Sequence, residues 1–416
     1  MDGDTVSNLN ETPRSNRLHI ALFGKTNAGK SSIINALTGQ NIALVSDVKG
    51  TTTDPVYKSM EILPLGPVVL IDTAGLDDET ELGELRKKKT MDVLNKADIA
   101  LVIIDSYAGM STFDIETIAE IKSKNIPVIT VLNKLDLKDI DAAAVKELED
   151  KLKIKIIKAS ASNNIGIDDI KTELIKSIPE EEDKFRIVGD LISPGDFVVL
   201  VTPIDKAAPK GRLILPQQQV IRDILESDAI SIVTKEYELR ETLENLNKKP
   251  RLVITDSQAF LKVSADTPKD ILLTSFSILL ARNKGDLTEL VKGAKAINRL
   301  KDGDKILISE ACTHHRQSDD IGKVKIPRWL RQSTGKDLSF EFSSGFSFPD
   351  NLKDYALVVH CAGCMLNRKA MLHRISSSIE AGVPIVNYGV LIAYVHGILE
   401  RALKPFPAAK FAFEEE

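Results

Sequence analysis

One eight-residue stretch constrains the fold of this 416-residue chain most: residues 24–31 read Gly-Lys-Thr-Asn-Ala-Gly-Lys-Ser. The apolar residues 19–23 precede it and the apolar residues 32–37 follow it, which predicts a strand and then a helix. Glycines allow backbone N–H groups to curl around phosphate oxygens, and a helix N-terminus adds positive potential there. The pattern therefore predicts a phosphate-binding loop in an α/β sheet, with Lys30 on the β- and γ-phosphates and Ser31 on Mg²⁺.

Two further motifs suit the same phosphate site. Residues 50–54, Gly-Thr-Thr-Thr-Asp, form a polar loop in which the Thr52 hydroxyl can reach the metal. Asp-Thr-Ala-Gly at residues 72–75 ends a predicted strand over residues 68–71. Asp72 suits an outer contact to Mg²⁺, and the Gly75 N–H suits the γ-phosphate.

Two more motifs indicate which base is bound. Asn-Lys-Leu-Asp at residues 133–136 ends a predicted strand over residues 128–132, and Ser160-Ala161 follows a strand over residues 154–158. The Asp136 carboxylate can accept hydrogen bonds from N1–H and the 2-amino group of guanine, a pair of donors that adenine lacks. Each motif alone is typical of a strand-ending turn, but all five lie in order at strand ends, where α/β sheets bind ligands.

The sequence thus predicts a site for GTP and Mg²⁺. The predicted nucleotide-binding residues are Gly24, Asn27, Ala28, Gly29, Lys30, Ser31, Ser32, Thr52, Asp72, Gly75, Asn133, Lys134, Asp136, Ser160 and Ala161. Among them, the predicted catalytic set is Lys30, Thr52, Asp72 and Gly75.

This set resembles the translation-factor-related GTPases of the Era/TrmE type. The resemblance implies that Asn27 helps to hold K⁺ beside the phosphates. Leu76 stands where Ras-type GTPases carry the glutamine that orients water, so slow intrinsic hydrolysis is expected, with K⁺ supplying positive charge. Glu84 is a candidate for orienting water, although such a glutamate is more often a solvated helix residue.

Composition shifts predict three α/β domains. Residues 1–177, with a polar tail over residues 1–17, form a P-loop GTPase domain with a doubly wound sheet. A charged linker leads to a small α/β domain over residues 183–265, and residues 266–416 form an α/β domain with a parallel sheet. The predicted strands after the linker cover residues 197–202, 230–234, 251–254, 305–309, 338–342, 355–359 and 384–387, and the predicted helices cover 217–226, 239–246, 266–281, 287–300, 368–381 and 390–403.

The small domain carries no catalytic constellation. Its short three-stranded sheet has open edges, which predicts that it forms a homodimer. An RNA-binding KH domain is excluded because no two glycines in the chain are three residues apart.

The chain has only three cysteines, and all lie in the last domain: Cys312, Cys361 and Cys364. They occur as Cys-x-His, with His314, and His-Cys-x-x-Cys, with His360. A single buried cysteine is usually a small hydrophobic residue, but a C-x-x-C pair favours a soft metal. Because each group follows a strand of a parallel sheet, the groups are expected to meet at one edge. On spacing alone, a closed zinc site completed by a histidine is favoured over an iron–sulfur cluster with one open iron.

The chain resembles the HydF family of FeFe-hydrogenase maturation GTPases. The resemblance rests on four features in combination: a TrmE-like GTPase domain, a small α/β domain, Cys-x-His and His-Cys-x-x-Cys. The resemblance spans essentially the whole chain in domain order. It implies a 4Fe-4S cluster on Cys312, Cys361 and Cys364, with an exchangeable fourth position near His314 and His360. It also implies a scaffold that receives a transient di-iron precursor from radical-SAM maturases and passes it to apo-hydrogenase.

Composition excludes several other classes. The net charge of -5 and the missing RNA module argue against nucleic acid as a partner, and no apolar run reaches membrane-spanning length. The polar start and the odd cysteine count favour a reducing, cytoplasmic setting. The alternatives are a zinc-stabilised Era/TrmE-like assembly GTPase and an oxidoreductase, the latter disfavoured because no G-x-G-x-x-G is present.

Overall fold

A computed structural model describes residues 12–39, 55–73, 90–138, 140–178, 186–204, 213–311, 320–345 and 348–415. The chain divides into two compact units, Met1–Glu180 and Glu181–Glu416.

The first unit is built on a six-stranded sheet in the order β2-β3-β1-β4-β5-β6. All neighbouring pairs are parallel except β2 and β3. The strands are β1 (Leu18–Phe23), β2 (Val56–Ile62), β3 (Gly66–Asp72), β4 (Ile99–Asp105), β5 (Val128–Asn133) and β6 (Lys155–Lys158).

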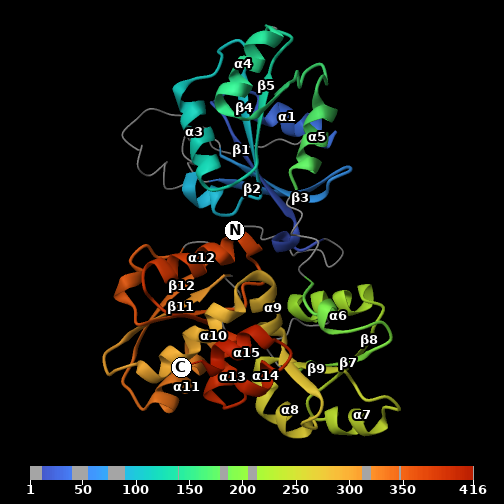
Figure 1. Cartoon of the computed structure of the whole chain (residues 1–416), viewed down its shortest axis with the longest axis vertical. Coiled ribbons are helices and arrows are strands. Elements are labelled where there is room, and N and C mark those ends of the chain that lie inside the picture. Colours follow the sequence, from blue (N-terminus) through green and yellow to red (C-terminus); the bar gives the residue numbers. More distant parts are fainter. Residues whose placement is uncertain are drawn as a thin grey trace, which may run out of the picture. The chain divides into compact units, whose positions relative to one another are not determined.

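Helices cover both faces of this sheet (Figure 1). Side chains of β1 alternate between two cores, with Ile20 and Leu22 in one and Ala21 and Phe23 in the other. The first core includes residues of α1 (Lys30–Thr38) and α5 (Ile167–Lys176), and the second includes residues of α3 (Thr112–Ser123) and α4 (Ala142–Leu152). The predicted doubly wound sheet is therefore confirmed.

The second unit contains two four-stranded sheets, in the orders β10-β9-β7-β8 and β12-β11-β13-β14. Every pair in both sheets is parallel. The strands are β7 (Phe197–Val201), β8 (Ile230–Thr234), β9 (Leu252–Thr255), β10 (Leu272–Ser275), β11 (Lys305–Glu310), β12 (Ser339–Ser344), β13 (Leu357–His360) and β14 (Ile385–Asn387).

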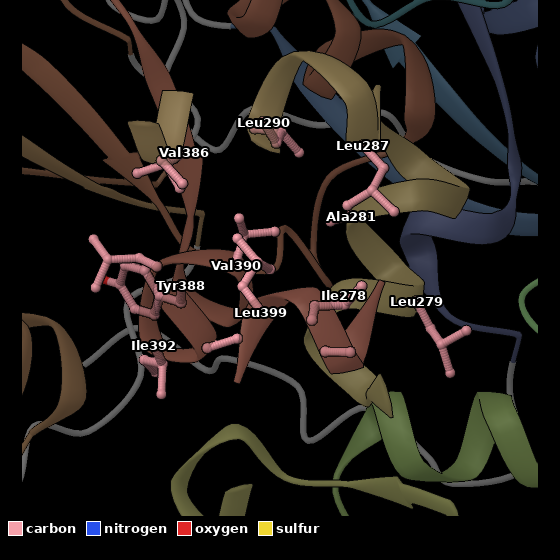
Figure 2. Close-up of a cluster of buried hydrophobic side chains, with 14 of the residues drawn as sticks. Ile278, Leu279, Ala281, Leu287, Leu290, Val386, Tyr388, Val390, Ile392 and Leu399 are labelled. Carbon is pink, nitrogen blue, oxygen red and sulfur yellow. The ribbon is translucent and has the colours of Figure 1, made fainter. Parts of the chain in front are cut away.

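One continuous hydrophobic core joins these two sheets and their helices. Figure 2 shows part of it, where side chains of α9, α10, β14, α13 and α14 gather. The helices are α6 (Leu215–Glu226), α7 (Leu239–Asn245), α8 (Phe260–Asp266), α9 (Phe276–Lys284), α10 (Leu287–Lys295), α11 (Ile326–Thr334), α12 (Arg368–Glu380), α13 (Tyr388–Val395), α14 (Leu399–Ala402) and α15 (Pro407–Glu414).

Three predicted helices differ in the structure. The helix expected over residues 266–281 is wrong in its first part, because β10 precedes α9 and pairs with β9. The helix over 287–300 ends as α10 at Lys295 and continues as a 3-10 turn, and the helix over 390–403 is two helices, α13 and α14. The sheet of the small domain therefore has a fourth strand beyond the expected boundary at residue 265.

Among the residues described here, no helix has the length and apolar character needed to cross a membrane.

Candidate functional site: a P-loop and a cysteine loop

The P-loop connects β1 to α1 through backbone conformations that few residues adopt. Gly29, the N-cap of α1, has φ 93°, and Asn27 has φ 65°. A Cβ atom at Gly24 would lie 2.1 Å from the Ile103 carbonyl oxygen, and one at Gly29 would lie 2.2 Å from Asn133 Nδ2. Both glycines are therefore required by close approach as well as by backbone angle.

Lys30 begins α1 and is almost fully buried. Its Nζ donates to the Gly24 carbonyl oxygen at 2.5 Å and to that of Lys25 at 3.1 Å. These carbonyl oxygens keep the ammonium group at the loop. Nucleotide phosphates can replace them as the hydrogen-bond acceptors of Lys30. Ser31 is exposed in the first turn of the helix, as a hydroxyl that ligates Mg²⁺ must be.

Asn133 connects the predicted base-binding loops to the P-loop. Its Nδ2 donates to the Ala28 carbonyl oxygen at 3.1 Å, and its Oδ1 accepts from the Ala161 N–H at 3.1 Å. Lys134 has φ 66°, and its Nζ lies 2.8 Å from Asp105 Oδ2. The Asn-Lys pair thus fixes the position of the loop that carries Asp136.

Asp136 is exposed and is oriented by a buried serine. Ser160 Oγ donates to Asp136 Oδ1 at 2.5 Å, and this hydrogen bond holds the pKa of the carboxyl below its usual value. Asp136 is therefore ionised at neutral pH, ready to accept two N–H groups. A hollow beside the Ser160 loop is lined by Ser32, Asn35, Ala36, Gly39, Ala161, Ser162 and Asn164.

Asp72 ends β3 beside the P-loop strand and is 5% exposed. Thr73 Oγ1 donates to the Leu22 carbonyl oxygen at 2.5 Å, which fixes the chain as it leaves the strand. The predicted positions Thr52, Gly75, Leu76 and Glu84 lie outside the described residues.

The cysteine loop begins where β13 ends, next to the end of β11. Ser309 of β11 pairs with His360 of β13, and the Cys361 N–H donates to the Ser309 carbonyl oxygen at 3.0 Å. The predicted shared edge of these two strands is confirmed. Cys312 and His314 lie outside the described residues, which stop at Ala311 on that side.

Backbone N–H groups surround the Cys361 thiol. Its Sγ accepts from the Ala311 N–H at 3.2 Å and from the Gly363 N–H at 3.4 Å. Burial raises the pKa of the Cys361 thiol to about 11, and the two N–H donors oppose that rise. Cys364 is half-buried in the same loop.

His360 is fully buried, and both ring nitrogens have protein partners. Arg374 donates to Nε2 at 2.7 Å, so this network assigns the ring proton to Nδ1, which lies 2.7 Å from the Cys361 carbonyl oxygen. Burial, and then the Arg374 charge, lower the pKa of His360 to about 3. The imidazole is neutral, and ligation of a metal would require it to exchange one of these hydrogen bonds.

Three charged residues near the thiols belong to no sequence motif, so the sequence did not predict them as part of the site. Lys284 is 4% exposed, and burial lowers its pKa to about 8 while the Cys364 and Cys361 thiols raise it. Arg374 and Glu310 are also buried, and Glu310 accepts from the Tyr388 hydroxyl at 3.1 Å. Their only sequence signal is a charge next to or within a predicted apolar element.

Within the ranges that the structure describes, no three His, Cys, Asp or Glu side chains gather as a metal-binding group. Cys312 and His314 of the predicted site lie outside these ranges.

Three family models match consecutive parts of the chain. Residues 19–134 match the model described as 50S ribosome-binding GTPase. Residues 187–285 match the hydrogen maturase F dimerization domain, and residues 288–405 match the hydrogen maturase F tetramerization domain. The latter two together cover more than half of the chain, in the order that the family implies.

The chain belongs to the hydrogen maturase F family. Its first unit is a GTPase domain, and the boundary between the two other domain models falls between α9 and α10. The family assignment predicted from the P-loop and cysteine motifs is confirmed.

Curated relatives match the GTPase part of this hydrogen maturase F family member. The tRNA modification GTPase MnmE of Endomicrobium trichonymphae is 34% identical over 192 residues, which are 45% of this chain and 41% of that protein. MnmE of Chromobacterium violaceum is 36% identical over 162 residues, 39% of this chain and 35% of that protein. The chain thus spans less than half the length of these relatives, and the similarity concerns the GTPase domain.

Proposed function

We propose that this protein is a GTPase scaffold for FeFe-hydrogenase maturation. It holds a 4Fe-4S cluster on Cys312, Cys361 and Cys364, receives a di-iron precursor from radical-SAM maturases and passes it to apo-hydrogenase. The observation that carries the proposal is the hydrogen bond from Ala311 to Cys361 at the shared ends of β11 and β13. It supports a three-cysteine site because Ala311 is bonded to Cys312.

The donor set suits an iron–sulfur cluster. Thiolates are the ligands of such clusters, and N–H groups that donate to sulfur stabilise their negative charge. A cluster held by three thiolates supplies one iron whose fourth ligand can exchange. His314 and His360 remain candidates for that position, but His360 must first release Arg374 or the Cys361 carbonyl. A closed zinc site needs a fourth protein ligand and, if His360 supplies it, must break these hydrogen bonds, whereas a cluster can leave that position to an exchangeable ligand.

The experiment that tests this function is transfer of the precursor. Protein purified without oxygen from cells that contain the radical-SAM maturases is expected to activate apo-hydrogenase, measured as hydrogen evolution. The same preparation of a Cys364→Ser variant is the control. Equal activation by both proteins would contradict the proposal.

The GTPase domain is proposed to use Mg²⁺, held by Ser31 and Thr52, and K⁺, held with the help of Asn27. GTP hydrolysis is expected to be about tenfold faster in KCl than in NaCl, because a fixed cation stabilises the charge that develops on the phosphates. Asn27→Gly is the matched variant, since glycine keeps the φ of 65° and removes the amide oxygen. Equal rates in both salts for the unaltered protein would rule out the K⁺ role.

The homodimer is proposed to form along the edge strand β8. The Ile230 N–H donates to the Asp196 carbonyl, and the Thr234 carbonyl accepts from Thr202, so these alternate residues face β7. The N–H of Val233 therefore points away from the sheet, and its side chain is 47% exposed. Val233→Pro removes that donor and is expected to weaken the dimer about tenfold, measured by sedimentation equilibrium.

The control for this edge is Val233→Thr, which keeps the N–H and the branched side chain. It is expected to dimerise as the unaltered protein does. A proline variant that dimerises equally well would place the interface elsewhere.

A further inference from the structure

Two cationic side chains connect the last turn of α9 with the cysteine loop and the start of α12. Lys284 Nζ donates to three carbonyl oxygens of the loop, those of Leu366 at 3.0 Å, Cys364 at 3.1 Å and Gly363 at 3.4 Å. In return, Arg368, the first residue of α12, donates to the carbonyl oxygens of Asn283 at 2.6 Å and Gly285 at 3.4 Å. We call these two sets of contacts the Lys284–Arg368 clasp.

Burial of Lys284 in the clasp costs free energy, which favours a functional role for this residue. Lys284 is 4% exposed, and a buried ammonium is strongly unfavourable unless polar groups replace its water. Here the carbonyls of one short loop supply that replacement, so the loop conformation and the lysine charge depend on each other. Without Lys284, these carbonyls would lose a charged donor inside the protein.

Helix α9 is a rigid base for this contact. Ser275 Oγ accepts from the Ile278 N–H at 3.2 Å at the start of the helix, and Asn387 Nδ2 donates to the Ser277 carbonyl at 3.1 Å. Figure 2 shows Ile278 and Ala281 of this helix within the hydrophobic core. Lys284 therefore extends from a helix that is anchored in the core at several positions.

We propose that Lys284 is a positioning residue of the metal site. Lys284 holds residues 361–367 in the conformation that presents the thiols, and it places a buried positive charge beside them. This inference rests on the proposed iron–sulfur function for its electrostatic part. A positive charge close to a cluster favours the reduced state, which is the more negative one. The clasp also joins the end of the dimerization domain, residues 187–285, to a loop of the tetramerization domain, residues 288–405.

The positioning part is tested on metal-free, full-length protein by hydrogen–deuterium exchange. Lys284→Met keeps the length of the side chain and removes the charge and the donors. Backbone amides of residues 361–368 are expected to exchange about tenfold faster in this variant. Amides of β7 and β9 report whether the rest of the unit stays folded.

Lys292→Met is the matched control for this experiment. Lys292 lies on the neighbouring helix α10, is exposed and pairs with Glu289 at 2.6 Å. Its replacement is expected to leave exchange in the loop unchanged. Equal exchange of residues 361–368 in Lys284→Met and the unaltered protein would overturn the positioning role.

The electrostatic part is tested on protein reconstituted anaerobically with iron and sulfide, by a redox titration followed by EPR. Lys284→Met is expected to disfavour the reduced cluster about tenfold, a shift of about 59 mV to lower potential for one electron. Lys284→Arg keeps the charge and is expected to restore the potential. An unchanged potential in Lys284→Met overturns the electrostatic role, whereas failure of the unaltered protein to take up any cluster overturns the proposed function itself.

Discussion

Replacement of Lys30 by methionine is expected to lower the affinity for GTP about 100- to 1,000-fold. Lys30 donates charge-assisted hydrogen bonds to the Gly24 and Lys25 carbonyls in the nucleotide-free loop. The same ammonium is placed to reach the β- and γ-phosphates, where each bond to a charged group contributes about 1.5–3 kcal/mol. Two such bonds contribute about 3–6 kcal/mol, and about 1.4 kcal/mol corresponds to a factor of ten. The expected loss lies in the lower part of that range because Lys30 gives up its carbonyl hydrogen bonds when it binds the phosphates.

Calorimetric titration with GTP in the presence of Mg²⁺ measures this effect. Lys25→Met is the matched control, because Lys25 belongs to the same loop but is exposed. It is expected to bind GTP within about threefold of the unaltered protein. A Lys30→Met variant that binds as tightly as this control would show that the loop does not hold the phosphates.

In the same assay, Asp136→Asn separates the contribution of base recognition to the affinity from that of the phosphates. The NH₂ group of asparagine is a donor where the 2-amino group of guanine also donates, so GTP is disfavoured, whereas xanthine carries a carbonyl oxygen in place of that amino group. The variant is expected to prefer xanthosine triphosphate, with Lys30 and the P-loop unchanged.

Replacement of Cys361 or Cys364 by serine is expected to lower the amount of bound cluster about tenfold or more. Serine keeps the size of the side chain but does not supply the soft thiolate that iron–sulfur clusters require. Cys361 is the more sensitive of the two, because its Sγ also accepts the N–H groups of Ala311 and Gly363. Iron and sulfide assays after anaerobic reconstitution measure the loss.

Met365→Leu is the control for the cysteine variants. Met365 lies in the same loop and is 39% exposed, and its replacement removes a sulfur atom without removing a thiol. All three variants are expected to bind GTP normally, because the nucleotide residues lie in the other compact unit. Full cluster content in both serine variants would contradict the assignment of the ligands.

The P-loop and most strands could be predicted from sequence because each depends on local residues. The shared edge of β11 and β13 could be predicted because alternating strands and helices favour a parallel sheet, whose strands end at one edge. β10 could not, since the apolar residues 271–273 and 278–281 flank only a short, mostly polar stretch and show no period that separates a strand from a helix. The partner of β10 is β9, and only the tertiary arrangement makes that pairing visible.

The surroundings of the cysteines also depend on tertiary contacts that the sequence does not reveal. Their spacing made His360 a natural candidate for a ligand, but the sequence does not reveal that Arg374 already occupies its Nε2. Likewise, Lys284 comes next to the cysteine loop only through the packing of α9 against the second sheet. Contacts between distant segments thus decide which of the residues near a motif are free to act.

The iron–sulfur site is tested most directly by metal analysis and EPR of the full-length protein purified without oxygen. We expect a brown protein that contains iron and acid-labile sulfide, and that gives a cluster signal after reduction. We also expect that Cys312→Ser, Cys361→Ser and Cys364→Ser each weaken that signal. A colourless protein that contains tightly bound zinc and no iron would contradict the iron–sulfur site.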